Sequence, residues 1–120
     1  MMDSLYIVET VSECVSVGYA GILENTSIGE NEIDFLIAFL PVYQGNGYGS
    51  EVLELLRDRW ITQTHSNHCT ASVQPRNEKS VKILKQCDFQ KTGEYVDLYN
   101  YKRHIYRYDI DTDTSQPGRQ

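Results

Sequence analysis

The stretch LPVYQGNGYGSEVLELLRDRW, residues 40–60, places a glycine-rich segment directly before an amphipathic pattern. Its glycines occupy positions 45, 47 and 49. Glycine adopts positive φ values at little cost and lets the backbone approach another group closely. Apolar side chains then recur at positions 52, 53, 56 and 60, which is the spacing of one face of a helix. The pattern predicts a glycine loop followed by a helix from Ser50 to about His65.

A loop of this kind is suited to binding an anion. The first turn of a helix has backbone N–H groups without partners, and the helix dipole favours negative charge there. Several amides could therefore hold a diphosphate without a lysine. The segment contains no Gly-Lys-Ser/Thr, and its third glycine comes too early for G-x-G-x-x-G, so neither nucleotide motif is present. The alternative is a glycine-rich turn with no ligand.

The rest of the chain alternates between strand and helix patterns. Period-two alternation over residues 4–22 predicts two strands with a break near Ser12–Glu13, followed by a turn-rich loop over 24–32. The apolar run 33–40 indicates a buried central strand that ends near Pro41. Further predictions are a strand over 68–75, a helix within 77–89, and a hairpin over 94–110 that turns near residues 100–103. These elements indicate a mixed α/β (α+β) fold.

Length and composition indicate one globular domain. The chain has 120 residues, of which 40% are hydrophobic. We expect a single domain over residues 1–110 and a polar tail over 111–120. No apolar run is long enough to span a membrane and no signal peptide is evident, so we expect a cytoplasmic protein. The three cysteines are widely spaced, which predicts neither a disulfide framework nor a metal site.

Charge is distributed unevenly along the chain. Residues 1–60 have a balance of −8 and residues 61–120 a balance of +2, and no lysine or arginine precedes Arg57. Nucleic acid is therefore not expected as a partner, because binding phosphates requires a basic surface. A cationic small molecule or a basic peptide would be favoured near the acidic half. The alternative is an acidic surface that only aids solubility.

Two sequence blocks together resemble the Gcn5-related N-acetyltransferase (GNAT) family. Gln44-x-x-Gly47-x-Gly49 is similar to the family's acetyl-CoA motif, Arg/Gln-x-x-Gly-x-Gly/Ala. Downstream, Pro75, Asn77, Ser80 and Phe89 match a second signature, in which Asp88 replaces the usual glycine. Ser80 and Leu84 resemble the branch that acetylates ribosomal-protein N-termini. The resemblance implies a mostly antiparallel, twisted sheet with a V-shaped splay between its central strands and flanking helices.

The resemblance also implies where acetyl-CoA would bind. Phe39 and Leu40 would contact pantetheine through the backbone, with an amide near the thioester oxygen. Asn77 would donate to the pantetheine arm and Ser80 would lie near it, although Asn77 could equally serve only as a helix N-cap. The pyrophosphate would bind amides of a continuous segment, made of Gln44, Gly45, Asn46, Gly47, Tyr48, Gly49 and Ser50.

The implied reaction is direct acetyl transfer to an amine, which must lose a proton before attack. Glu32 and Asp34, two residues apart and so on the same side of a strand, are candidate bases, or alternatively solvated acids at a strand end. Many family members use a tyrosine as the acid at the position of Leu84. Tyr99 and Tyr101, expected to share a strand face near the cleft, are the candidate acids here.

The front of the chain departs from the family pattern. Family members usually have a strand and two helices before the matched region, whereas the roughly thirty residues here read as strands. Either the acceptor pocket is open, which suits a protein N-terminus, or a second subunit completes it in a homodimer, which suits a small amine. Three functions stay possible: an N-acetyltransferase, a non-catalytic acyl-CoA sensor or regulatory subunit, and an interaction protein without ligand.

Overall fold

The computed structural model describes residues 4–110, so the predicted tail over 111–120 lies outside the described residues. The elements follow the order strand, strand, strand, helix, strand, helix, strand, strand, with a short 3₁₀ turn before the first helix. Their bounds are β1 Ser4–Glu9, β2 Ser16–Glu24, β3 Ile33–Phe39, η1 Pro41–Tyr43, α1 Tyr48–Thr64, β4 His68–Val73, α2 Glu78–Gln86, β5 Gln90–Val96 and β6 Lys102–Asp109.

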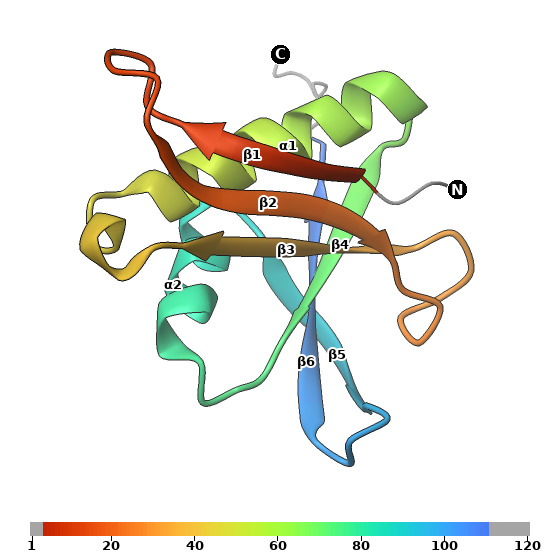
Figure 1. Cartoon of the computed structure of the whole chain (residues 1–120). Coiled ribbons are helices and arrows are strands. Elements are labelled where there is room, and N and C mark those ends of the chain that lie inside the picture. Colours follow the sequence, from red (N-terminus) through yellow and green to blue (C-terminus); the bar gives the residue numbers. More distant parts are fainter. Residues whose placement is uncertain (1–3, 111–120) are drawn as a thin grey trace.

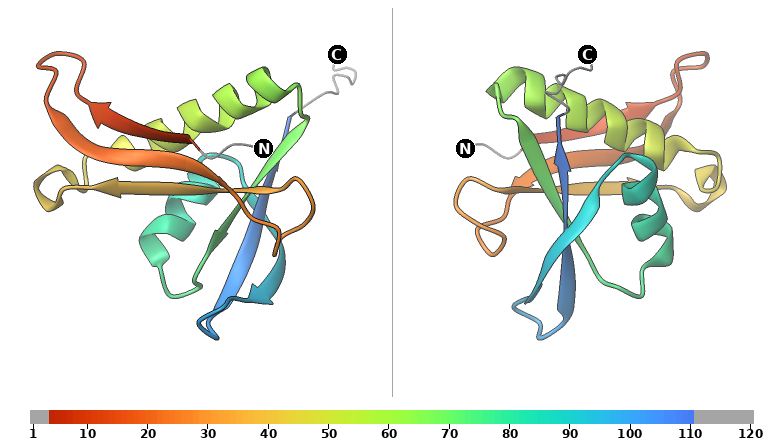
Figure 2. Two further views of the ribbon diagram at one scale, coloured as in Figure 1. Left: turned by 45° about the vertical axis from the view of Figure 1, so that its right-hand side comes forward. Right: turned by 180° about the vertical axis from the view of Figure 1, so that it is seen from behind.

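The strands form two antiparallel sheets that meet at an angle (Figure 1). One sheet has the order β1-β2-β3 and the other the order β4-β6-β5. Strands β3 and β4 are neighbours near the start of β3 and diverge from there, while α2 lies on the side where the angle opens (Figure 2). The predicted mixed α/β fold with a V-shaped splay is confirmed.

The core lies between α1 and the two sheets. One face of α1 contributes Leu53, Leu56 and Ile61, which are buried against the inner faces of the strands. Phe89, between α2 and β5, packs edge-on against Phe35 of β3 at a centroid distance of 6.2 Å. The same face of the first sheet carries Ala20, Ile22 and Ile33, so alternation along each strand separates the core from the open face.

Predicted boundaries differ from the observed ones in two places. Helix α1 begins at Tyr48 rather than Ser50, because Gly47 occupies the N-cap position in the left-handed region. The final hairpin turns over residues 97–101 rather than 100–103, because the Asp97 carboxylate accepts the amides of Tyr99 and Tyr101 and closes the turn earlier. In the described part of the chain, neither helix is long and apolar enough to cross a membrane.

Candidate functional site

A cleft of about 930 Å³ occupies the space where β3 and β4 diverge. One wall is β3 from Phe35 to Phe39, and the opposite wall is β4 from Ala71 to Val73 together with Gln74. The glycine loop and the first turn of α1 close one end, and α2 covers one side. The fold therefore brings the two sequence blocks, which lie about thirty residues apart, to one cavity.

The glycine loop presents free backbone donors to this cleft. The Gln44 amide donates to the Pro41 carbonyl at 3.2 Å, and the Glu51 amide donates to the Gly47 carbonyl at 3.3 Å. Between them, the amides of residues 45–50 have no acceptor within residues 4–110. The side chains of Gln44, Asn46 and Ser50 instead donate to carbonyls of the loop and of the strand before it. These contacts fix the loop while leaving its N–H groups available to an anion.

The three glycines of the loop differ in backbone conformation and in the space around them. Gly45 and Gly47 have φ values of 83° and 81°, and a Cβ atom at either position would meet nothing within 4 Å. Those side chains would fill the open space in front of the free amides. A Cβ atom on Gly49 would lie 2.7 Å from Cδ1 of Ile83, so the absence of a side chain at Gly49 leaves room for this residue of α2. Gly45 and Gly47 thus leave open space at the cleft, whereas Gly49 lines the cleft and also leaves room for Ile83.

Only alternate residues of β3 turn their backbone toward the cleft. The Leu40 amide donates to the Val17 carbonyl of β2 at 2.9 Å, so it is not available to a thioester, contrary to expectation. The amide of Ile33 donates toward β4, and strand alternation therefore directs the peptide groups of Ile37 and Phe39 to the cleft as well. Phe39 therefore lines the cleft, as predicted. Ile37 also lines the cleft, and it was not predicted to do so.

Helix α2 begins at the edge of the cleft. Asn77 is its N-cap, accepting the Ser80 amide through Oδ1 at 3.3 Å, and both residues line the cavity as predicted. Capping uses the amide oxygen and leaves Nδ2 for a ligand. Lys79 and Lys82 also line the cleft, and the sequence reasoning did not identify them. The sequence could have predicted them, because two lysines three positions apart lie on one face of a helix that begins beside Asn77.

The carboxylates of Glu32 and Asp34, predicted to share one side of a strand, both hydrogen-bond to β4, but neither lines the cleft. Glu32 accepts His68 Nε2 at 3.0 Å. Asp34 accepts the amides of Ser72 and Phe35 at 2.8 and 2.9 Å, together with the Ser72 hydroxyl. His68, the first residue of β4, is therefore a partner of Glu32.

The side-chain hydrogen bonds that connect β3 and β4, here called the joint, involve Asp34, Thr70 and Ser72. Of these residues, Ser72 also lines the cleft. Its hydroxyl donates to Asp34 and accepts from Tyr95 Oη at 3.3 Å and from Arg103 Nε at 3.0 Å. Arg103 also donates to the Ser72 carbonyl and lines the cavity. Tyr95 accepts from Asn25 of the β2–β3 loop at 3.1 Å. Tyr95 is thus the hairpin tyrosine whose hydroxyl reaches the joint.

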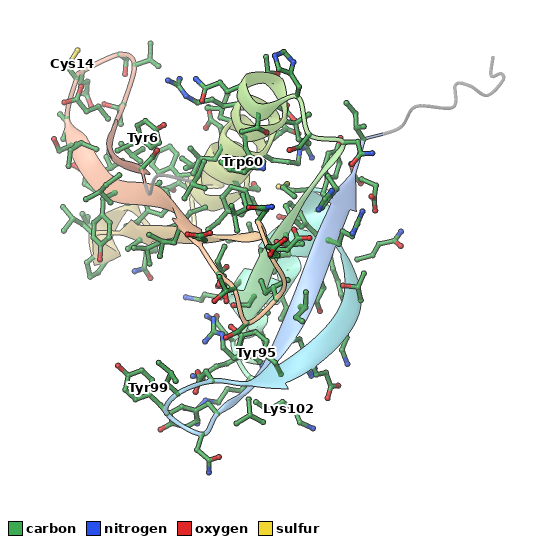
Figure 3. The ribbon with its side chains drawn as sticks, turned by 90° about the vertical axis from the view of Figure 1, so that its right-hand side faces the viewer. Tyr6, Cys14, Trp60, Tyr95, Tyr99 and Lys102 are labelled. Atoms are coloured by element: carbon green, nitrogen blue, oxygen red, sulfur yellow. The ribbon has the colours of Figure 1, made fainter. Side chains whose placement is uncertain are left out.

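Tyr99 and Tyr101 do not occupy the expected strand face. Tyr99 lies in the hairpin turn with 80% of its surface exposed, and it projects away from the body of the molecule (Figure 3). Tyr101 is 49% exposed and stacks with Arg76 at 5.7 Å. The earlier turn moves both residues out of the strands, and neither is among the residues that line the cleft.

The cysteines are all free thiols. Cys69 and Cys87 are buried, as expected of small apolar groups, whereas Cys14 is exposed at the β1–β2 turn (Figure 3). Burial raises the pKa of Cys69 to about 12 and also raises the pKa of Cys87. Both buried thiols therefore stay protonated near neutral pH and are poor nucleophiles. No group of three or more His, Cys, Asp and Glu side chains in residues 4–110 is arranged to hold a metal.

Comparison with known proteins identifies relatives of this arrangement. The sequence profile described as Acetyltransferase (GNAT) domain matches residues 3–90. The uncharacterized N-acetyltransferase p20 of Bacillus licheniformis is 39% identical over 61 residues, which are 51% of this chain and 34% of that protein. The chain thus spans about a third of the length of this curated relative.

Solved structures share the fold. A GNAT-family acetyltransferase from Bacillus anthracis has a TM-score of 0.75 and 18% identity, covering 88% of this chain and 65% of the other. Spermidine/spermine N-acetyltransferase SpeG from Vibrio cholerae, in complex with manganese ions, has a TM-score of 0.75 and 18% identity, covering 96% and 69%. A further structure of that spermidine N-acetyltransferase is described as dodecameric. At this identity the likeness shows the fold, and the ribosomal-protein branch stays a prediction.

Proposed function

Because the chain belongs to the GNAT family of acetyltransferases, we propose that it transfers an acetyl group from acetyl-CoA to a primary amine by direct attack. The observation that carries the proposal is the row of free amides at residues 45–50, facing a cleft between two diverging strands. Acetyl-CoA would supply the activated acetyl thioester. Everything else in the reaction is binding, orientation and proton transfer by the chain's own residues.

The cleft residues fit such a ligand from one end to the other. The free amides around Gly45 and Gly47 would hold the diphosphate, where each charge-assisted hydrogen bond contributes about 1.5–3 kcal/mol. Lys79 and Lys82 would add positive charge beside them. The cleft-facing peptide groups of Phe39 and the Nδ2 group of Asn77 would pair with the amides of the pantetheine arm.

Glu32 is the better placed of the two carboxylates to accept the proton of the amine through water. Its oxygens accept from His68, whereas the single Thr70 hydroxyl proton is donated to the Ile33 carbonyl, so lone pairs of Glu32 stay available. Asp34 accepts four hydrogen bonds, from Ser72, Phe35 and Asn25, so its acceptor sites are occupied. Tyr99 and Tyr101 are not proposed as acids, because both lie in the hairpin turn.

The acceptor would be a small cationic amine or a protein N-terminus. The absence of lysine and arginine before Arg57 favours a cationic molecule near the first sheet, and the structural neighbour SpeG is a spermidine N-acetyltransferase. We also place the protein in the cytoplasm, where three free thiols stay reduced. Leu5, Ile7 and Tyr19 form an exposed apolar face on the first sheet. A second copy of the chain would cover this face and complete the acceptor pocket in a homodimer.

One observation favours a second function, a non-catalytic acyl-CoA sensor or regulatory subunit. The described residues that line the cleft include no Asp, Glu, His or Cys, and Leu84 stands where many family members have the tyrosine acid. Such a cleft could bind acetyl-CoA without promoting proton transfer. Binding and turnover therefore have to be measured separately.

The test combines thermal denaturation with a thiol-release assay. Acetyl-CoA should raise the melting temperature under both functions, since a ligand that binds only the folded state stabilises it. Release of free thiol with a panel of polyamines and peptides should occur only for the acetyltransferase. Binding without thiol release across the panel would support the sensor, and an unchanged melting temperature would contradict both.

A further inference from the structure

Strands β3 and β4 are joined by side chains where a backbone ladder would be expected. They lie side by side near Ile33 and Thr70 yet belong to separate hydrogen-bonded sheets. The Thr70 hydroxyl accepts the Ile33 amide at 3.2 Å and donates to the Ile33 carbonyl at 2.7 Å. A side chain of β4 thus takes both hydrogen bonds that a neighbouring backbone would otherwise take.

Asp34 does the same from the opposite strand. Its Oδ1 atom accepts the Ser72 amide of β4 at 2.8 Å and the Phe35 amide of β3 at 2.9 Å. One carboxylate oxygen therefore binds one backbone donor from each strand at the point where the cleft begins. Oδ2 accepts the Ser72 hydroxyl and Asn25 Nδ2, and these bonds hold the carboxylate in place.

Inserting these side chains has a geometric consequence. Neighbouring backbones in a ladder lie about 4.8 Å apart, whereas a hydroxyl or a carboxylate between them requires a larger separation. The strands therefore begin to diverge at the joint, and the peptide groups beyond it, those of Ile37 and Phe39, are left without a partner strand. An unpaired strand edge is a template for an extended chain of amides.

We propose that Asp34 and Thr70 are positioning residues that prevent β3 and β4 from closing into a ladder and so keep the β3 edge open for the pantetheine arm. The inference rests on the proposed function and gives Asp34 a role different from a catalytic base. Its saturated carboxylate sets the width of the cleft and does not exchange a proton with the amine.

Binding of two ligands separates the joint from the glycine loop. Adenosine 3′,5′-diphosphate would occupy only the anion-binding end, whereas acetyl-CoA also needs the open β3 edge. By isothermal titration calorimetry, we expect Asp34→Leu and Thr70→Val to lose at least about tenfold in acetyl-CoA affinity. Affinity for the diphosphate should change less than about twofold, because the glycine loop is untouched. Thr70→Ser, which keeps the hydroxyl, is the matched control and should bind as wild type.

Two further measurements keep the test decisive if Asp34→Leu folds poorly. Asp34→Asn, which retains an acceptor oxygen, should keep the acid limb of the pH profile of kcat/KM and most of the rate. If Asp34 were the base, this variant would instead lose the acid limb and about 10²–10⁴ in rate. In Thr70→Val, hydrogen exchange at the Ile37 and Phe39 amides should slow as the strands pair.

Several outcomes would overturn the inference. Unchanged acetyl-CoA affinity in Asp34→Leu and Thr70→Val would show that the joint does not determine the width of the cleft. Equal losses for both ligands would show a general disruption of the site. Loss of the acid limb in Asp34→Asn would make Asp34 the base. Failure of the wild-type protein to bind acetyl-CoA would instead overturn the proposed function, and this inference with it.

Discussion

Gly47 combines a backbone requirement with a ligand requirement. It precedes α1 with a φ of 81° and a ψ of 2°, and the space that its side chain would fill is open. In Gly47→Val, the branched side chain would occupy the diphosphate position and oppose positive φ, at a cost of about 1–3 kcal/mol. We expect acetyl-CoA affinity to fall at least about tenfold, measured by calorimetry, with the fold retained by circular dichroism.

Gly93→Ala is the control for this prediction. A Cβ atom added to Gly93 of β5 would make an ordinary contact of 3.6 Å with Ile105 of β6, and Gly93 does not line the cleft. The control should therefore bind acetyl-CoA as the wild type does. Equal affinity in Gly47→Val and the wild type would show that the diphosphate does not lie on this loop.

At single positions, the sequence was informative where chemistry is local. The glycine spacing predicted the loop, because positive φ depends on a residue and its immediate neighbours. Leu40 was misjudged because the direction of its amide depends on pairing with Val17, which is 23 positions away in the chain. Tyr99 was misjudged for a related reason, since one carboxylate, that of Asp97, moved the turn.

Helices α1 and α2 are connected through a buried arginine. Arg57 Nη1 donates to the Cys87 carbonyl at 2.7 Å, and the guanidinium lies 4.2 Å from the centre of the Tyr108 ring. Arg57→Met should lower the free energy of unfolding by about 2–4 kcal/mol, because the carbonyl at the end of α2 loses its charged donor. Urea denaturation followed by circular dichroism measures this change.

Arg59→Met serves as the control in the same helix. Arg59 is exposed and only stacks near Tyr6 at 5.4 Å, so its replacement should cost no more than about 1 kcal/mol. If both variants lose the same stability, the contact between Arg57 and Cys87 does not contribute beyond a surface contact.

Element types were predictable, but their mutual contacts were not. The periodicities of α1 and α2 and the alternation of the hairpin gave the right classes, because each depends on a local pattern. Arg57 lies on the same helix face as Leu53 and Leu56, so the helix pattern directs this charge toward the core. The pattern does not reveal its acceptor, the carbonyl of Cys87 thirty residues later, because that contact is tertiary.

For the whole molecule, the splay of the sheets depends on contacts that no local pattern reveals. The run over residues 33–40 predicts a buried strand, and 68–75 predicts another, but pattern alone would let them pair. Thr70 and Asp34 reach across 37 and 38 positions of sequence to keep them apart. The splay was predicted only through the resemblance to a family, and the side-chain bonds to which we attribute it became visible only in the structure.

The open face of the first sheet gives a prediction about assembly. Leu5 and Ile7 of β1 are 69% and 65% exposed, and strand pairing places Tyr19 and Leu36 on the same face, which also carries exposed apolar surface. A contiguous apolar face of this kind usually marks an interaction surface. We expect sedimentation equilibrium to show a concentration-dependent dimer for the wild type and a monomer for Ile7→Glu, because burying an unpaired carboxylate at the contact is unfavourable. Val11→Glu, at an exposed turn off this face, should dimerise normally, and a wild type that stays monomeric at all concentrations would exclude the homodimer.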